Sequence, residues 1–287
     1  MTTLYNVVLF GLLLGGVYAV MAYGLGLIYG VMRIVNLAHG VVLMLAAYGA
    51  YSLNATWHLD PAVALTIILP LAYLAGLVMY RLLVQRVMAG PPMAALLLLF
   101  GVSLCARNAA YLLWTGDDRS LTVPYSLSTV SLGVPVPLTK LVIFGASLVA
   151  TAGMYMLFRH SHFGRAVRAI TEDPGVAELA GLDVGRISAR AFATGTAIGA
   201  LGGVLLSTIY VINPELGGPF LLKSFCIIVL GGMSSMGGIF AGALTLGIAE
   251  TAAGVYGTAS SQDLVSFALL VLILVVKPGG LPSLVRR

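Results

Sequence analysis

A few polar and ionisable side chains interrupt the long apolar stretches of this sequence, and they are its first candidates for chemistry. Arg107 with Asn108 stands in one such stretch, and Glu250 stands in another. If these stretches lie in lipid, ionisable groups are costly there and mark a functional site by default. The structural alternative is that they pair with neighbours or extend to an interface. The sequence leaves both readings open.

Two short polar breaks add further candidates. The first covers residues 33–40 and the second covers residues 231–238, which are rich in glycine and serine. Irregular backbone at membrane depth is tolerated only where protein or a water-filled cavity satisfies it, and broken helices are common near transport pathways. A simple interfacial turn is the alternative in each case. The candidates for a translocation pathway are therefore Asn36, His39, Arg107, Asn108, Ser234, Ser235 and Glu250.

Enzymatic and metal-binding chemistry find little support. His39, His160 and His162 could be imagined with the serines as a protease site, but no H-E-x-x-H or G-x-S-G pattern occurs. The two cysteines lie in apolar stretches without metal-ligand spacing. Residues 218–224 come near a P-loop, but Leu222 replaces its second glycine. We expect no catalytic residue, no metal and no cofactor bound by this chain.

Composition indicates the class of protein. Sixty per cent of the 287 residues are apolar and nine per cent are charged, against about 25% charged residues in a soluble domain. The uncharged stretches approach or exceed the roughly 20 residues that cross a bilayer. We predict an all-α, polytopic transmembrane bundle that forms a single domain over 1–287. Its eight or nine spans lie near 5–30, 34–53, 62–80, 93–114, 138–158, 189–212, 220–232, 239–257 and 262–277.

Basic residues predict the orientation. Arg81, Arg86 and the arginines of the loop 159–190 mark the cytoplasmic side, which makes the loop 115–137 and the N-terminus external. The tail carries Lys277, Arg286 and Arg287, so a cytoplasmic C-terminus requires an odd number of crossings. A break at 231–238 supplies the ninth. The net charge of +5 follows this loop pattern and does not indicate nucleic-acid binding.

Small residues predict close helix packing. Gly195, Gly199 and Gly203 share one helical face, and the same spacing recurs in other stretches. Segments 15–24 and 202–211 look faintly alike and would run in opposite directions. An inverted repeat, which is common in transporters, is compatible with this likeness.

The loop 159–190 predicts a short helix over about 174–180. Asp173 fits its N-cap, Pro174 its first turn and Gly181 its C-terminal stop. Asp183 then caps the next helix. The exposed face is expected to include Val176, Ala177, Leu179 and Ala180. It could insert into a groove on a partner protein or lie in lipid headgroups.

Three ordered blocks resemble the LivH/LivM family of branched-chain amino acid ABC permeases. The first is a Gly/Tyr-rich helix that ends in a turn with Asn36, Ala38, His39 and Gly40. The second is the loop GRAVRAITEDPGVAELAGLDVGRI, which departs from the E-A-A-x-x-x-G form of many other importers. The third is INPELGGPFLLKSFCIIVLGGMSSMGGIFAGALTLGIAE, followed by a closing KPGGL.

The resemblance implies a permease subunit in the bacterial inner membrane. Two homologous permeases would pair, two cytoplasmic ATPases would hydrolyse ATP with magnesium, and a periplasmic protein would deliver solute. Residues Asp173, Pro174, Ala177, Glu178, Leu179 and Gly181 would form the coupling helix on an ATPase. Branched-chain amino acids are the expected solutes, with urea, short amides or aromatic acids as alternatives within the family. A secondary transporter or a channel is the competing class.

Overall fold

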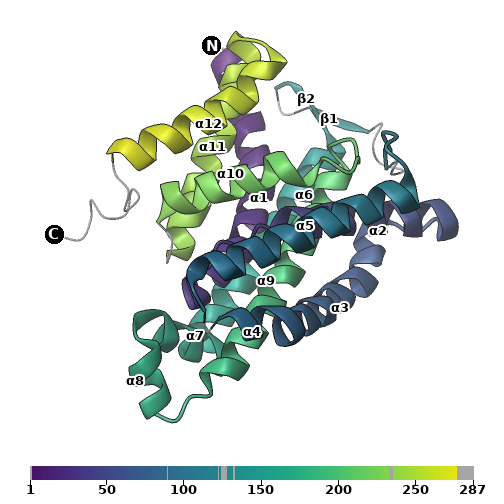
Figure 1. The fold of residues 1–287 in the computed structure, drawn as a ribbon. Helices are drawn as coiled ribbons and strands as arrows, with labels where there is room; N and C mark the ends of the chain where they lie inside the picture. Colours follow the sequence, from purple (N-terminus) through teal and green to yellow (C-terminus); the bar gives the residue numbers. More distant parts are fainter. Residues whose placement is uncertain are drawn as a thin grey trace.

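The structure is a computed structural model that describes residues 2–88, 90–121, 123, 128–131, 133–232 and 235–276. These residues form a helical bundle with one small antiparallel hairpin (Figure 1). The elements are α1 (Thr2–Met32), α2 (His39–Trp57), α3 (Pro61–Met79), the π-helical turn η1 (Tyr80–Val84), α4 (Gln85–Val87), α5 (Pro92–Trp114), β1 (Thr129–Ser131), β2 (Pro135–Pro137), α6 (Leu138–His160), α7 (His162–Glu172), α8 (Pro174–Leu179), α9 (Val184–Ser207), α10 (Gly217–Gly231), α11 (Met236–Tyr256) and α12 (Ala259–Val276).

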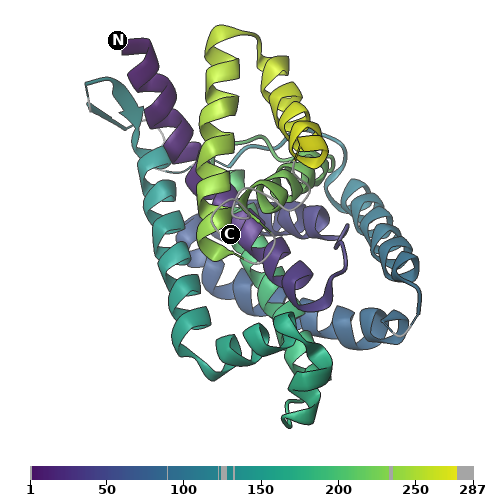
Figure 2. The ribbon, with the colours of Figure 1, turned by 90° about the vertical axis from the view of Figure 1, so that its left-hand side faces the viewer.

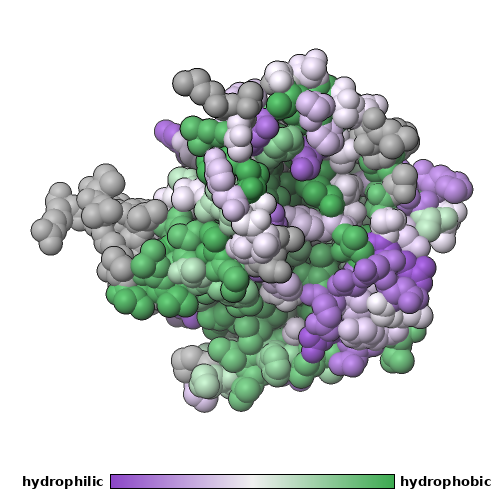
Figure 3. All heavy atoms as spheres, turned by 90° about the horizontal axis from the view of Figure 1, so that it is seen from above, coloured by the Kyte–Doolittle hydropathy of each residue, from purple (hydrophilic) through white to green (hydrophobic). Residues whose placement is uncertain are grey.

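Each of the nine predicted spans corresponds to a helix. Six helical stretches are long and apolar enough to cross a membrane: 3–32, 61–87, 93–114, 138–160, 184–207 and 236–256. The other three, α2, α10 and α12, are shorter or less apolar. Apolar side chains form a large patch on the face seen from above in Figure 3, and residues such as Leu112 and Val149 are among the large apolar side chains exposed on the protein. A polytopic helical membrane protein explains this surface, because lipid covers what water would not.

The predicted loops lie at opposite ends of the bundle. The N-terminus of α1 and the β1–β2 hairpin share one end, whereas α7 and α8 lie at the other (Figures 1 and 2). Arg33 lies at the end with α7, since its Nη2 donates to the carbonyl of Thr171 at 3.3 Å. The relative sidedness of 115–137 and 159–190 is therefore as predicted. Which end faces the cytoplasm stays a prediction, and the basic tail lies outside the described residues.

Helices α1 and α9 form the centre of the bundle. In the apolar windows of these helices, 72% and 78% of the residues are buried, against 11% in α5. Glycines allow the close approach that the sequence predicted: a Cβ added at Gly195 would lie 2.6 Å from the carbonyl oxygen of Gly24. In lipid, such backbone contact replaces the hydrophobic drive that holds soluble helices together.

The packing follows an inverted pattern. α11 packs on α1 as α3 packs on α9, and both pairs run antiparallel. α2 lies beside α9 and α10 lies beside α1, and the first turns of α2 and α10 meet at Gly40 and Gly217. The segments 15–24 and 202–211 do not mark this relation. The first lies within α1, whereas the second covers the end of α9 and the turn beyond it.

Both predicted breaks are present. α1 ends at Met32, and Arg33 adopts a left-handed conformation with φ of 53° before α2 begins at His39. α10 ends at Gly231, Gly232 has φ of 84°, and α11 begins at Met236. The Ser235 side chain accepts from the backbone N–H of Gly238 and caps α11.

Candidate functional site

The short helix α8 is built as the sequence predicted. The Asp173 side chain accepts from the N–H groups of Gly175 and Val176, at 2.8 and 3.1 Å. Pro174 opens the helix, and Gly181 ends it with φ of 84°. Asp183 then caps α9 by accepting from the N–H of Arg186. Because all these termini are satisfied locally, α8 holds its shape without a partner.

One face of α8 projects from the molecule (Figures 1 and 2). The side chain of Leu179 is 90% exposed and that of Val176 is 62% exposed, and Glu178 and Ala180 are exposed as well. The expectation that Ala177 belongs to this face is wrong, because Ala177 is 3% exposed and packs inward. An exposed leucine of this kind suits a groove on another surface.

Helix α7 holds α8 in position, and the sequence analysis did not predict this helix. Ser161 caps α7 by accepting from the N–H of Gly164 at 2.9 Å. Val167 and Ile170 are buried, and the arginines of α7 lie on its exposed side. The i, i+3 spacing of these two apolar residues between charged ones was the available signal. α7 packs against α6, α9 and α1, so α8 is held at a fixed place below the bundle.

Glu250 lies in a buried polar cluster between four helices. It is 1% exposed and accepts a hydrogen bond of 2.6 Å from the hydroxyl of Tyr18 on α1. Lys223 of α10 places its Nζ 3.2 Å from the same carboxylate oxygen. Ser266 of α12 donates to the other carboxylate oxygen. Each oxygen of this buried carboxylate therefore has a donor, which is what burial of a charge requires.

Lys223 has a second carboxylate partner. Asp263 of α12 lies 3.0 Å from its Nζ, and the Asp263 side chain is 57% exposed. The ammonium also lies 5.3 Å from the ring centre of Phe220 and 5.6 Å from that of Tyr18. One lysine thus joins α10 to both α11 and α12. In the sequence, Lys223 stands between two apolar stretches and belongs to the third block that resembles the LivH/LivM family, but no partner was predicted for it. A lone lysine in an apolar helix was the signal that carboxylate partners lie nearby.

The break before α2 buries two predicted pathway residues. His39 is fully buried, with its Nε2 3.0 Å from the carbonyl oxygen of Met21. A Cβ added at Gly199 would lie 2.7 Å from the His39 ring, so the ring fills the space beside α9. Asn36 accepts from the N–H of Ala38 at 3.0 Å. Among the described residues, His39 Nδ1 and Asn36 Nδ2 have no hydrogen-bond partner.

The remaining pathway candidates lie elsewhere. Arg107 pairs with Glu215 at 3.0 Å on the exposed side of α5, and Asn108 donates to the carbonyl of Leu104. Ser235 serves as a cap, and Ser234 lies outside the described residues. Among the described candidates, the backbone N–H of His39 donates to the carbonyl of Asn36 at 3.1 Å, and no side-chain hydrogen bond joins one candidate to another. Their role in translocation stays a prediction.

Comparison with known proteins identifies the family. The model of a family described as "Branched-chain amino acid transport system / permease component" matches residues 7–274. The chain belongs to this permease family. It is therefore a transporter component and not an enzyme.

Individual relatives support the same family assignment. The chain is 32% identical to the high-affinity branched-chain amino acid transport system permease protein LivH of Salmonella typhimurium, over 94% of this chain and 92% of that protein. It is 33% identical to BraD of Pseudomonas aeruginosa, over 94% and 93%. Among solved structures, PsaBC from Streptococcus pneumoniae in complex with Fab matches with a TM-score of 0.52 at 10% identity, over 97% of this chain and 94% of that one. This last likeness shows the fold alone.

Proposed function

We propose that this permease is the membrane-spanning subunit of an ATP-driven importer of branched-chain amino acids in the bacterial inner membrane. The family supports the permease role, and the names of LivH and BraD support the solute class. Urea, short amides and aromatic acids are the alternatives that the experiment below separates.

The observation that carries the ATP-driven mechanism is the exposed helix α8. Its capped ends and its packing on α7 hold it as a fixed projection from the bundle, and Leu179 is its most exposed apolar side chain. A cytoplasmic ATPase that grips α8 differently in its open and closed states supplies a coupling free energy to the spans. Asp173, Pro174 and Gly181 fix the shape, Ala177 seats the helix, and Glu178 and Leu179 make the contact.

The assembly that we propose contains two homologous permeases, two cytoplasmic ATPases that use ATP and magnesium, and a periplasmic binding protein. The end with α7 and α8 faces the cytoplasm. The N-terminus and the β1–β2 hairpin then face the periplasm, where the binding protein docks. The clustering of arginines at the α7–α8 end supports this orientation.

The test is solute uptake by a bacterium that lacks its own branched-chain amino acid permeases. The strain receives this chain together with the ATPase, second-permease and binding-protein genes that neighbour it. We expect uptake of labelled leucine, with competition by isoleucine and valine but not by urea or a short amide. Leu179→Asp abolishes uptake at unchanged membrane expression, and Leu179→Met, which keeps an apolar side chain, retains it.

Three outcomes contradict the proposal in whole or in part. Full uptake by Leu179→Asp at wild-type expression would remove α8 from the coupling step. Uptake that survives ATP depletion and collapses with a proton uncoupler would assign the protein to the secondary transporters instead. Preferred competition by urea, an amide or phenylalanine would change the solute and leave the coupling mechanism intact.

A further inference from the structure

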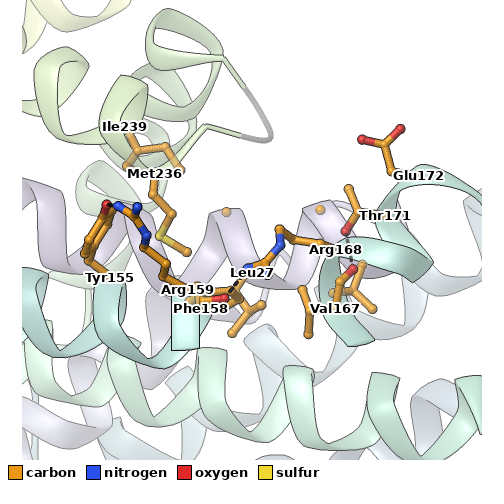
Figure 4. A pocket seen from close by; sticks show the side chains of 13 residues that line it. Leu27, Tyr155, Phe158, Arg159, Val167, Arg168, Thr171, Glu172, Met236 and Ile239 are labelled. Atoms are coloured by element: carbon orange, nitrogen blue, oxygen red, sulfur yellow. Dashed lines mark hydrogen bonds between the residues drawn. The ribbon is translucent and has the colours of Figure 1, made fainter. Parts of the chain in front are cut away.

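A cavity of about 460 Å³ opens between α1, α6, α7 and α11 at the end of the bundle that carries α8 (Figure 4). It lies apart from the Lys223–Glu250 cluster and from the exposed face of α8, since it shares no residue with either. Its walls divide into an apolar part within the bundle and a polar part at the junction of α6 and α7.

The apolar part is a slot beside α1. Gly26 and Gly30 leave the α1 backbone bare on this side, and Leu27 and Val31 flank them. Met236 and Ile239 of α11 face the slot from the opposite wall (Figure 4). The described residues that line this half are Gly26, Leu27, Gly30, Val31, Met236 and Ile239, and none of them has a polar side chain. Aliphatic walls of this kind suit an acyl chain.

The polar part is cationic. Arg159, in the last turn of α6, donates to the hydroxyl of Tyr155, and Arg168 of α7 donates to the carbonyl of Phe158. A guanidinium carries five N–H donors, so most donors of both side chains remain available. Neither arginine forms an ion pair within the described part of the chain.

The net charge of the side chains in and beside the cavity is positive. Glu172 is the one acidic residue among the lining residues, and it stands at the opposite edge of the cavity from Arg159 (Figure 4). Arg33 adds a third cation beside the cavity, because it donates to the carbonyl of the lining residue Thr171. The charges of Arg33, Arg159, Arg168 and Glu172 sum to +2. Guanidinium groups bind phosphate through paired N–H donors, so this end of the cavity selects a phosphate.

The polar part lies toward the membrane surface and the apolar part lies deeper, which is the arrangement of the headgroup and acyl chains of a phospholipid. α6 crosses the membrane and ends at His160, so Arg159 lies at the boundary between hydrocarbon and headgroups. The slot beside Gly26 and Gly30 continues from there toward the bundle. Basic pockets between transmembrane helices on the cytoplasmic side bind anionic headgroups. A free phosphate would satisfy the arginines but would leave the slot empty.

We propose that this cavity binds one anionic phospholipid of the leaflet that borders α7 and α8. Its phosphate lies between Arg159 and Arg168, and one acyl chain lies against Gly26 and Gly30. The lipid bridges α6, α7 and α11 to α1, and it thereby supports the segment from which α8 projects.

The test is lipid retention by the purified full chain, measured by native mass spectrometry after delipidation and titration. The probes are phosphatidylglycerol and phosphatidylcholine with identical acyl chains. We expect at least tenfold preferential retention of phosphatidylglycerol, which Arg159→Gln/Arg168→Gln lowers to the level of phosphatidylcholine. The matched control is Arg165→Gln, an arginine of α7 that lies outside this cavity and contacts His162; it should retain the preference.

A second pair of measurements separates a lipid from a free anion. Gly30→Leu places a side chain in the slot, so it should lower phosphatidylglycerol retention without lowering the binding of inorganic phosphate. Each variant is first checked for monodisperse elution. If the double variant fails that check, Arg159→Gln alone replaces it, since Arg159 donates its hydrogen bond to Tyr155, a side chain of the same helix.

Four results would overturn the inference. Equal retention of the two lipids by the wild type would show that no headgroup is recognised. Wild-type retention by the arginine variant would remove the two guanidinium groups from the site. Displacement of the lipid by leucine, or an unchanged lipid affinity in Gly30→Leu, would assign the cavity to the solute path or to an inorganic anion.

Discussion

Loss of the Lys223 ammonium should destabilise the protein more than loss of the Glu250 carboxylate. In Lys223→Met, Glu250 stays buried, and the described residues offer its carboxylate no other cation. Removal of one partner from a buried ion pair costs about 3–5 kcal/mol. In Glu250→Gln, Lys223 keeps Asp263 at 3.0 Å. That variant loses one charge-assisted hydrogen bond, which contributes about 1.5–3 kcal/mol.

The double variant provides the sharper test. Lys223→Met/Glu250→Gln removes both charges from the buried site. The amide oxygen that replaces one carboxylate oxygen can still accept from Tyr18, and the amide NH2 that replaces the other can donate to the Ser266 hydroxyl, which can in turn donate to the carbonyl of Gln262. In this variant the Asp263 carboxylate loses its lysine partner, but it is half-exposed and can be hydrated by water instead. The double variant should therefore be more stable than Lys223→Met alone. Interaction energies between contacting residues reach about 0.5–3 kcal/mol, and this pair should lie in the upper part of that range.

The assay is unfolding in mixed micelles by titration with sodium dodecyl sulfate, followed by tryptophan fluorescence. Trp114 is a suitable reporter, because it stacks on Tyr48 with ring centres 4.7 Å apart. Lys140→Met is the matched control, since Lys140 contacts the Phe10 ring and no carboxylate in the described residues. It should change the free energy of unfolding by about 1 kcal/mol or less. Additive single effects, or a Lys223→Met variant as stable as wild type, would refute the reasoning.

Two further predictions concern the close packing of helices at Gly195 and the capping of α8 by Asp173. Gly195→Val would place a branched side chain against the carbonyl of Gly24, 2.6 Å from the new Cβ; we expect poor expression and aggregation in fluorescence-detected size exclusion, whereas Gly153→Val, where nothing lies within 4 Å, should elute as the wild type does. Asp173→Ala removes the cap of α8 and about 1 kcal/mol of local stability; uptake should fall while the unfolding midpoint of the bundle stays unchanged, and Asp173→Asn should restore uptake. A lower global midpoint in Asp173→Ala would contradict a purely local role.

The sequence could predict what depends on local chemistry. Charge-free stretches located nine helices in the described part of the chain, six of which are long and apolar enough to cross a membrane, and the cap of Asp173 with the stop at Gly181 located α8. These features follow from the cost of burying charge and from the satisfaction of helix ends. Boundaries were less accurate. The expected span 189–212 lies in α9, Val184–Ser207, whose start after the Asp183 cap was predicted but whose end comes at Ser207 rather than near residue 212.

The sequence could not predict what depends on contacts between distant segments. Tyr18, Lys223, Glu250 and Ser266 come from four helices, and no local spacing relates them. Ala177 was assigned to the exposed face because a six-residue helix has too few turns to show which side is apolar. The inverted arrangement was suspected from a faint likeness, but the structure places it in the order of the helices.

The distribution of contacts decides which helices can move during transport. α1, α9 and α11 meet through glycines whose backbones touch, and a packed backbone contact has no side chain that can rotate to accommodate sliding. α5 and α12 are held differently. α5 is tied to its neighbours by Arg107–Glu215 and by Trp114, and α12 is tied by Asp263 and Ser266. Such side-chain bonds can be exchanged for bonds to water or to a partner. We therefore predict that the central helices act as the frame and that α5 and α12 shift when the ATPase proposed above pulls on α8.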